Sequence, residues 1–147
     1  MMTRRKFAFL AAAALAGSAL PAAAQYAPKV TMYKNPACGC CGDWAKHMEA
    51  NGFRVETQMM ADVTPVKQKF GVPETLYSCH TAVVGGYAIE GHVPATDVWR
   101  LLREKPAVKG LSVPGMVVGS PGMETGPAQR FATIAFSGSS KRVFAQH

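Results

Sequence analysis

The sequence predicts a single α/β domain, and three observations lead to this fold class. A chain of 147 residues is long enough for one domain with a hydrophobic core. Short β-prone runs alternate with helical patterns through residues 30–104. The remainder is rich in glycine and proline and ends in two further β-prone runs. We see no internal repeat and expect no second domain.

The first 24 residues are predicted to be an export signal that is not part of the domain. A basic segment, Thr3-Arg4-Arg5-Lys6-Phe7, precedes an apolar run from Ala8 to Leu20, and small residues at 21–24 allow cleavage after Ala24. The apolar run is short and rich in alanine, which disfavours a membrane anchor. We therefore expect a signal peptide over residues 1–24, of the twin-arginine or general secretory type. Residues 25–147 would then be a periplasmic domain with no membrane association after cleavage.

Removal of the signal changes the charge of the protein. The formal net charge of the whole chain is +7, and loss of Arg4, Arg5 and Lys6 lowers it to +4. The remaining basic residues, Lys67 among them, are scattered and are not interleaved with aromatic residues. A solvated surface explains them, so nucleic-acid binding is not expected.

The first three elements follow in order from Val30. Val30-Thr31-Met32-Tyr33 is a short β-prone run that predicts a first strand. Residues 43–50 predict a helix that ends at Asn51-Gly52, a common C-terminal signal. Alternation over residues 54–60 then predicts a second strand.

A short helix, a hairpin and a longer helix come next. Thr64 is predicted to be the N-cap of a helix that has Pro65 at its first position. Gly85-Gly86 lies between two β-prone runs and predicts a hairpin. Residues 95–104 predict a third helix with one apolar face. The resulting order, β-α-β-α-β-β-α, is the thioredoxin-like arrangement.

The C-terminal part is predicted to be an extension of this domain. Residues 110–124 are too apolar for a free linker, so we expect an ordered loop that wraps the domain. The β-prone runs at 131–136 and 142–144 flank Ser137-Gly138-Ser139-Ser140 and predict a closing hairpin. The predicted fold is thus one thioredoxin-like domain with a Gly/Pro-rich C-terminal extension and a closing β-hairpin.

Three of the four cysteines lie in one short stretch, Cys38-Gly39-Cys40-Cys41, between the first predicted strand and helix. Unpaired N–H groups and the positive end of the dipole at a helix N-terminus favour the thiolate over the thiol. Such a site suits either disulfide exchange or the binding of a soft metal ion.

Two structural disulfides are an alternative interpretation, since cysteines of exported proteins are often paired. Cys40 and Cys41 are adjacent, and adjacent cysteines rarely pair with each other. Cys38 could pair with Cys41 as a C-x-x-C, and Cys40 could pair with Cys79, which would close the site.

The crowding of the cysteines favours several metal ions over one. Thiolates select Cu(I), Zn(II) or iron–sulfur clusters, and a structural zinc site needs four ligands that converge on one ion. Successive residues at a helix start point about 100° apart, so these cysteines are poorly placed around a single ion. They suit several ions that share bridging sulfurs. Each Cu(I) would also cancel one negative charge.

Four residues outside this stretch are further candidates. Cys79 precedes the third predicted strand, at the edge that faces the cysteine turn, so we expect it to complete the site. His92, at the end of the hairpin, is equally consistent with a ligand and with a structural residue. His80 should point to the opposite face of the strand from Cys79. His47 should face solvent.

Two tryptophans and two methionines are interpreted as structural residues and not as ligands. Trp44 and Trp99 are expected in the core. Met116 and Met123 lie in Pro-Gly-Met turns. Their thioethers suit Cu(I), but methionine more often fills gaps, and we expect that role here.

The stretch Tyr33-Lys34-Asn35-Pro36-Ala37-Cys38-Gly39-Cys40-Cys41-Gly42-Asp43-Trp44 resembles the CopG-type periplasmic copper-resistance proteins, a family long classed as a domain of unknown function. The similarity extends to Ser78-Cys79-His80-Thr81, to residues 90–95 and to residues 119–124, so it covers most of the mature chain. The resemblance implies a thioredoxin-like fold that carries a redox-active polynuclear copper cluster and a role in handling periplasmic copper.

Matching positions in this resemblance imply a set of metal ligands. They are Cys38, Cys40, Cys41 and Cys79, with His92 as the histidine. The pair Cys79-His80 stands where a thioredoxin-like disulfide exchanger has its cis-proline, which disfavours an exchange function.

From the residues and the resemblance together, we predict a periplasmic protein for copper tolerance that binds more than one Cu(I) ion and could cycle copper or thiol redox state. Its expected partners are copper ions and other periplasmic copper-handling proteins. The alternatives are a thiol–disulfide oxidoreductase that uses Cys38 and Cys41, and a zinc-stabilised domain.

Overall fold

The computed structural model describes residues 26–147, so the predicted signal peptide lies outside the described residues. No helix in the described part of the chain is long and apolar enough to cross a membrane. The elements and their bounds, in chain order, are β1 (Lys29–Lys34), α1 (Gly39–Ala50), β2 (Arg54–Met59), α2 (Thr64–Lys69), the 3₁₀ turn η2 (Glu74–Leu76), β3 (His80–Val84), β4 (Tyr87–Glu90), α3 (Ala95–Glu104), β5 (Gly110–Ser112), β6 (Ala132–Ser137) and β7 (Ser140–Gln146).

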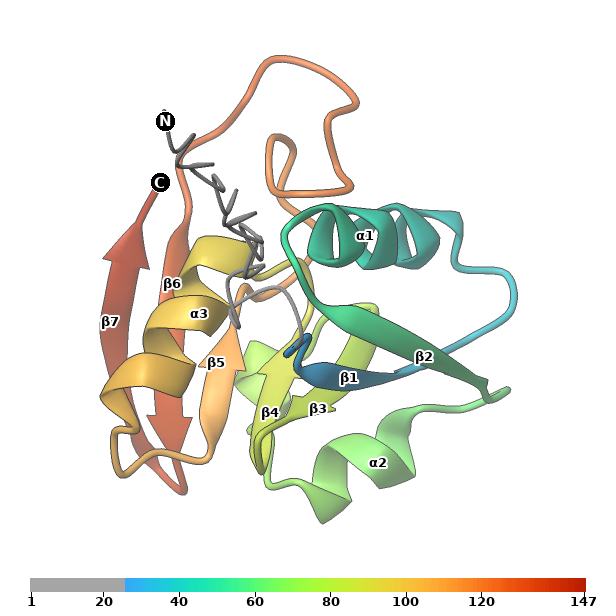
Figure 1. The fold of residues 1–147 in the computed structure, drawn as a ribbon. Helices are drawn as coiled ribbons and strands as arrows, with labels where there is room; N and C mark the ends of the chain where they lie inside the picture. Colours follow the sequence, from blue (N-terminus) through green and yellow to red (C-terminus); the bar gives the residue numbers. More distant parts are fainter. Residues whose placement is uncertain (1–25) are drawn as a thin grey trace, which may run out of the picture.

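All seven strands form one sheet in the order β2-β1-β3-β4-β5-β6-β7. The β1–β2 and β4–β5 pairs are parallel, and the other pairs are antiparallel. Figure 1 shows α1 and α2 on opposite sides of the β1–β3 part of the sheet. The mixed α/β class and the order β-α-β-α-β-β-α are confirmed.

The C-terminal extension is joined to the same sheet. β5, which the sequence did not predict, runs parallel to β4 and pairs on its other edge with β6. A Cβ at Gly110 would collide with the backbone of Ala88, so glycine is required for this close pairing. Three residues are too few to show a strand pattern, which explains why we expected a loop from residue 110 onward. The predicted closing hairpin is confirmed as β6 and β7.

Two helix starts differ from the sequence prediction. α1 begins at Gly39, not at Asp43, so the cysteine stretch forms its N-cap and first turn. α2 has Val63 as its N-cap, and Thr64 is already helical. The Asp62 carboxylate accepts a hydrogen bond from the Thr64 N–H at 2.9 Å, which gives this turn a side-chain acceptor earlier than the sequence suggested.

The core holds α1 against the sheet through Trp44. Its side chain is fully buried, as predicted, and its Nε1–H donates to the carbonyl of Val93 at 2.9 Å. The indole ring also packs against the imidazole of His80, with ring centroids 4.5 Å apart. Trp99 is only partly buried and packs on Phe53 instead. Trp44 therefore fixes the start of α1 relative to the histidine-bearing strands.

Candidate metal site

The four cysteines converge at the start of α1. Cys38 is the N-cap, Cys40 and Cys41 lie in the first turn, and Cys79 immediately precedes β3. Because β3 pairs antiparallel with β1, the start of β3 lies beside the end of β1, from which the cysteine turn leaves. The four Sγ atoms lie within 4.8 Å of one another.

Two of the cysteines are oxidised. Cys38 and Cys41 form a disulfide with their Cα atoms 5.6 Å apart, while Cys40 and Cys79 are free thiols. The Sγ atoms of Cys38 and Cys40 are 3.6 Å apart. One bond of the two-disulfide alternative is thus present, and the other, between Cys40 and Cys79, is not. In this state the cluster offers two thiols and the neighbouring histidines.

The Cys79 thiol is held in its neutral form. It is partly buried, and burial together with the neighbouring Cys40 raises its pKa to about 11. At neutral pH such a group is mainly protonated, and a nearby positive charge favours loss of the proton. A bound metal cation is one way to supply that charge.

His92 presents its unprotonated nitrogen to Cys79. Its Nδ1 lies 2.6 Å from the carbonyl oxygen of Pro121, which can only accept, so Nδ1 carries the proton and Nε2 carries the lone pair. Nε2 lies 3.1 Å from the Sγ of Cys79. Burial lowers the pKa of His92 and so favours the neutral imidazole. A backbone carbonyl that fixes the tautomer is the usual support of a metal-ligating histidine.

His80 lies in the same cluster, contrary to the sequence prediction. Its Nδ1 is 3.3 Å from the Sγ of Cys79, and the two residues form with His92 a second group of close donors. We expected opposite faces from strand alternation, but β3 begins only at His80, so the rule does not apply to Cys79. Among residues 26–147, Nε2 of His80 is the buried side-chain atom that has no hydrogen-bond partner. Burial, with the nearby His92 and Lys67, lowers the pKa of His80 well below its usual value.

The other sequence candidates lie elsewhere. His47 does not face solvent: its Nε2 accepts a hydrogen bond from the Ala95 N–H at 3.0 Å, at the start of α3. The prediction was wrong because α1 packs beside that helix end. Met116 is 52% exposed and fills no gap, so that interpretation was wrong as well. Met123 is partly buried.

The C-terminal extension packs directly on this cluster. Gly122 has φ +86°, and a Cβ there would lie 2.7 Å from the backbone nitrogen of Trp44 and 3.1 Å from Nδ1 of His92. Only glycine fits both the backbone conformation and the space. The Pro121-Gly122 turn therefore lies against both α1 and His92.

Lys67, which we expected on the solvated surface, is buried beside Glu90 and Thr81. Its Nζ lies 2.5 Å from the carboxylate of Glu90, and both side chains are almost inaccessible to solvent. A scattered lysine in the sequence carries no sign of a buried partner on another element, so this pair was not predictable.

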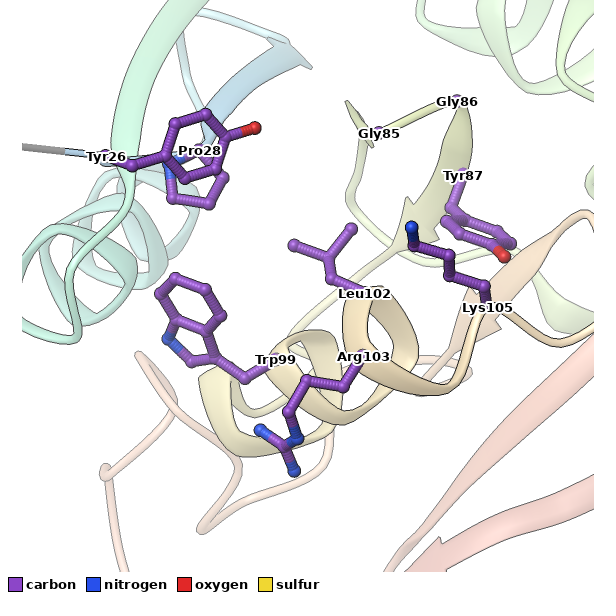
Figure 2. A pocket seen from close by; sticks show the side chains of 9 residues that line it. All are labelled: Tyr26, Pro28, Gly85, Gly86, Tyr87, Trp99, Leu102, Arg103 and Lys105. Carbon is purple, nitrogen blue, oxygen red and sulfur yellow. The ribbon is translucent and has the colours of Figure 1, made fainter. Parts of the chain in front are cut away.

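A separate cavity of about 580 Å³ lies between the start of β1, the β3–β4 turn and α3 (Figure 2). Its lining is mainly aromatic and aliphatic, with two basic side chains, and comprises Tyr26, Pro28, Gly85, Gly86, Tyr87, Trp99, Leu102, Arg103 and Lys105. None of these residues belongs to the cysteine and histidine cluster, so the cavity and the cluster are distinct features.

The donors of the cluster fit a soft metal ion. One close group consists of four cysteine sulfurs, and the other of one sulfur and two imidazole nitrogens. Neither contains a carboxylate, which suits Cu(I) or Zn(II) and not hard cations. With metal–sulfur bonds of about 2.3 Å, two sulfurs on one ion lie about 4 Å apart, so the observed spacing allows shared ions. The imidazole of His92, whose tautomer a backbone carbonyl fixes, agrees with this assignment.

The chain is similar to two solved structures, described as Form 2 and Form 1 of copper resistance protein CopG. Each is 43% identical to it over 83% of this chain, and the match covers 99% and 98% of those chains with TM-scores of 0.79 and 0.78. A family model described as "Protein of unknown function, DUF411" matches residues 76–123, which include Cys79, His80, His92 and Gly122. No curated protein matches.

Proposed function

The chain belongs to the family of the copper resistance protein CopG, and on this premise we propose that it is a copper-binding protein that serves copper tolerance. The observation that carries the proposal is the convergence of four cysteine sulfurs within 4.8 Å beside buried imidazoles. The proposed ligands are Cys38, Cys40, Cys41, Cys79 and His92.

We propose that the metal is Cu(I) and that more than one ion binds. Four thiolates in a partly buried site would carry four negative charges, which is costly without compensation. Monovalent ions that share bridging sulfurs would cancel these charges one at a time. The crowding of three cysteines around the first turn of α1 supports several ions over one tetrahedral centre.

The disulfide connects this site to thiol redox state. Reduction of the Cys38–Cys41 bond takes up two electrons and yields two thiolates. The full set of four sulfur ligands exists only after this reduction. Copper loading is therefore proposed to require the reduced protein, and oxidation of the two thiolates would release sulfur ligands from copper.

Metal analysis of the purified protein tests the proposal. The protein should be reduced, titrated anaerobically with Cu(I), freed of unbound metal and analysed for copper and zinc. More than one copper per chain, retained against excess zinc, is the expected result. A titration that ends at one equivalent, or displacement of copper by zinc, would contradict the cluster.

A thiol–disulfide oxidoreductase is the second candidate, because Cys38 and Cys41 form a disulfide at the N-terminus of α1. An exchanger needs only an attacking and a resolving thiol. Insulin reduction that survives Cys79→Ser and is lost in Cys41→Ser would favour this function. A shared copper site predicts instead that Cys40→Ser and Cys79→Ser lower copper stoichiometry about as much as Cys38→Ser does.

We also propose a cellular location and partners for this function. The basic, apolar and small-residue segments of residues 1–24 support export to the periplasm, with residues 25–147 as the mature domain. Copper ions and other periplasmic copper-handling proteins are the proposed partners. Cell fractionation that recovers the full-length protein in the cytoplasm would contradict this placement.

A further inference from the structure

Glu90 is a buried carboxylate that the proposed ligand set does not use. It is the last residue of β4, two positions before His92, and its side chain is inaccessible to solvent. Burial raises its pKa, and the ammonium group of Lys67 opposes that change. A carboxylate buried from solvent is unfavourable unless each oxygen has a hydrogen-bond or charge partner. The partners of Glu90 therefore indicate which part of the fold it stabilises.

Glu90 accepts hydrogen bonds from the residues on both sides of Cys79-His80. Its Oε1 accepts a hydrogen bond from the Ser78 N–H at 2.7 Å, and its Oε2 accepts one from the Thr81 hydroxyl at 2.6 Å. Ser78 and Thr81 are the residues on either side of Cys79-His80. One carboxylate thus holds both ends of the segment that carries these two donors.

Lys67, on α2, supplies the counter-charge to Glu90. Its Nζ lies 2.5 Å from Oε1 of Glu90 and donates to the Thr81 hydroxyl at 3.1 Å. The lysine comes from α2, so three elements meet at this carboxylate. The lysine charge offsets the cost of burying the ionised Glu90 carboxylate away from water.

The backbone links the same segment to the strand that carries His92. Thr81 is paired directly with Glu90 in the β3–β4 register, and the Gly91 N–H donates to the His80 carbonyl at 3.0 Å. A Cβ at Gly91 would collide with the side chain of Ser78, so the two segments are in close contact. The distance from Cys79 to His92 therefore depends on how residues 78–81 are held.

We infer that the Glu90 carboxylate, charge-paired with Lys67, is the positioning group of this site, which fixes Cys79 and His80 relative to His92 before a metal ion binds. The inference rests on the proposed copper-binding function, because one of its two tests measures Cu(I) affinity. The position of Cys79 can also be measured without metal, which keeps the two proposals separable.

A charge-neutral double variant separates positioning from stability. Lys67→Met alone leaves the buried Glu90 carboxylate without its counter-charge and should lower the melting temperature strongly. Lys67→Met with Glu90→Leu replaces the pair by apolar side chains and should recover much of that loss. The hydrogen bonds of the carboxylate to Ser78 and Thr81 are then absent. Cu(I) affinity should therefore remain about 10- to 100-fold below wild type, which is the usual effect of losing a group that supports a metal ligand.

Alkylation of the metal-free protein provides a second readout. In the form with the Cys38–Cys41 disulfide, Cys40 and Cys79 are the free thiols. Iodoacetamide labelling with peptide mapping gives the rate at Cys79 relative to Cys40. The double variant should raise this ratio, because the segment around Cys79 is released while the turn of α1 is not.

Asp97→Asn is the matched control. Asp97 is also a buried carboxylate, and its Oδ2 accepts from the Thr133 hydroxyl at 2.6 Å and contacts His147 Nε2 at 2.8 Å. It makes no hydrogen bond to residues 78–81. This variant should lose stability without a change in Cu(I) affinity, measured by competition with a chromogenic Cu(I) chelator, or in the alkylation ratio.

Affinity that follows melting temperature across the series, with an unchanged alkylation ratio, would overturn the inference. If the double variant does not fold, Glu90→Gln replaces it: a raised alkylation ratio supports the inference, and a wild-type ratio with wild-type affinity overturns it. If the wild type binds no Cu(I), the proposed function fails, and the alkylation ratio alone then decides whether Glu90 positions Cys79.

Discussion

The candidate site has two halves that are built in different ways. The helix half consists of Cys38, Cys40 and Cys41, which are close in sequence and share the first turn of α1. The sheet half consists of Cys79, His80 and His92, which β3 and β4 bring together and the C-terminal extension covers. Two of the three sulfurs in the helix half are joined in a disulfide, whereas every donor in the sheet half is unoxidised.

This difference separates two tasks. The helix half can change the number of available donors, since reduction of one bond adds two thiolates. The sheet half keeps its geometry through hydrogen bonds that the Pro121 carbonyl and the Glu90 carboxylate accept. We therefore expect redox state to control the helix half and rigid packing to control the affinity of the sheet half.

The largest expected effect is on the helix half. Wild-type protein should take up several Cu(I) ions when reduced and markedly less copper when the Cys38–Cys41 disulfide is formed. Cys41→Ser removes the Cys38–Cys41 disulfide, so the difference in copper content between oxidised and reduced samples should be smaller in this variant. Copper analysis after gel filtration measures this. A wild-type copper content that is equal in both states would remove the proposed role of the disulfide.

The next effect is on the sheet half. His92→Ala removes a neutral nitrogen that faces Cys79 at 3.1 Å, so it should weaken Cu(I) binding while the disulfide still forms. His47→Ala is the control, because His47 accepts a hydrogen bond at the start of α3 and belongs to neither group of close donors. Chelator competition provides the affinities. Equal affinities of wild type and His92→Ala would return His92 to a structural role.

A smaller effect concerns the turn that covers the sheet half. Gly122→Ala adds a Cβ 2.7 Å from the backbone of Trp44 at a positive φ, so it should cost about 1–3 kcal/mol of stability and weaken Cu(I) binding. Gly86→Ala has a similar φ of +82° but nothing within 4 Å, so it measures the backbone strain alone. Urea unfolding compares the two. Equal losses in both variants would contradict a tight contact at Gly122.

The smallest effect is a pH dependence outside both halves. Burial lowers the pKa of His47, whose Nε2 must be unprotonated to accept from the Ala95 N–H. This contribution to stability is fully present above about pH 6.5, the pKa in the unfolded chain, and is lost as pH falls through the lower folded-state pKa. His47→Ala should lose about 1 kcal/mol at pH 7, as other helix caps do, and less at acidic pH. Unfolding curves at several pH values test this. A loss that is the same at every pH would mean that the contact does not depend on neutral His47.

The sequence was sufficient for features that depend on local pattern. The bounds of α3, the Gly85-Gly86 hairpin and the closing hairpin follow from periodicity and turn residues, and the structure confirms them. The cysteine stretch was visible as a motif. Its resemblance to the CopG family is confirmed by the structural matches.

The features that were missed depend on contacts between distant elements. β5 is a strand only because β4 and β6 flank it. His80 joins Cys79 because the strand begins one residue later than alternation assumed, and the buried Lys67–Glu90 pair links α2 to β4. Sequence patterns describe single elements, so neither the partner of Lys67 nor the contact of His47 with α3 could be predicted from them.

X-ray absorption at the copper edge of the reduced, Cu(I)-loaded protein tests the central claim most directly, because it reports the atoms bound to copper. If the two halves share one cluster, the first shell should be mainly sulfur with a smaller nitrogen contribution, and copper–copper scattering should be present. His92→Ala should lower the nitrogen contribution and keep the sulfur shell. A shell of nitrogen and oxygen without copper–copper scattering would contradict the shared cysteine site.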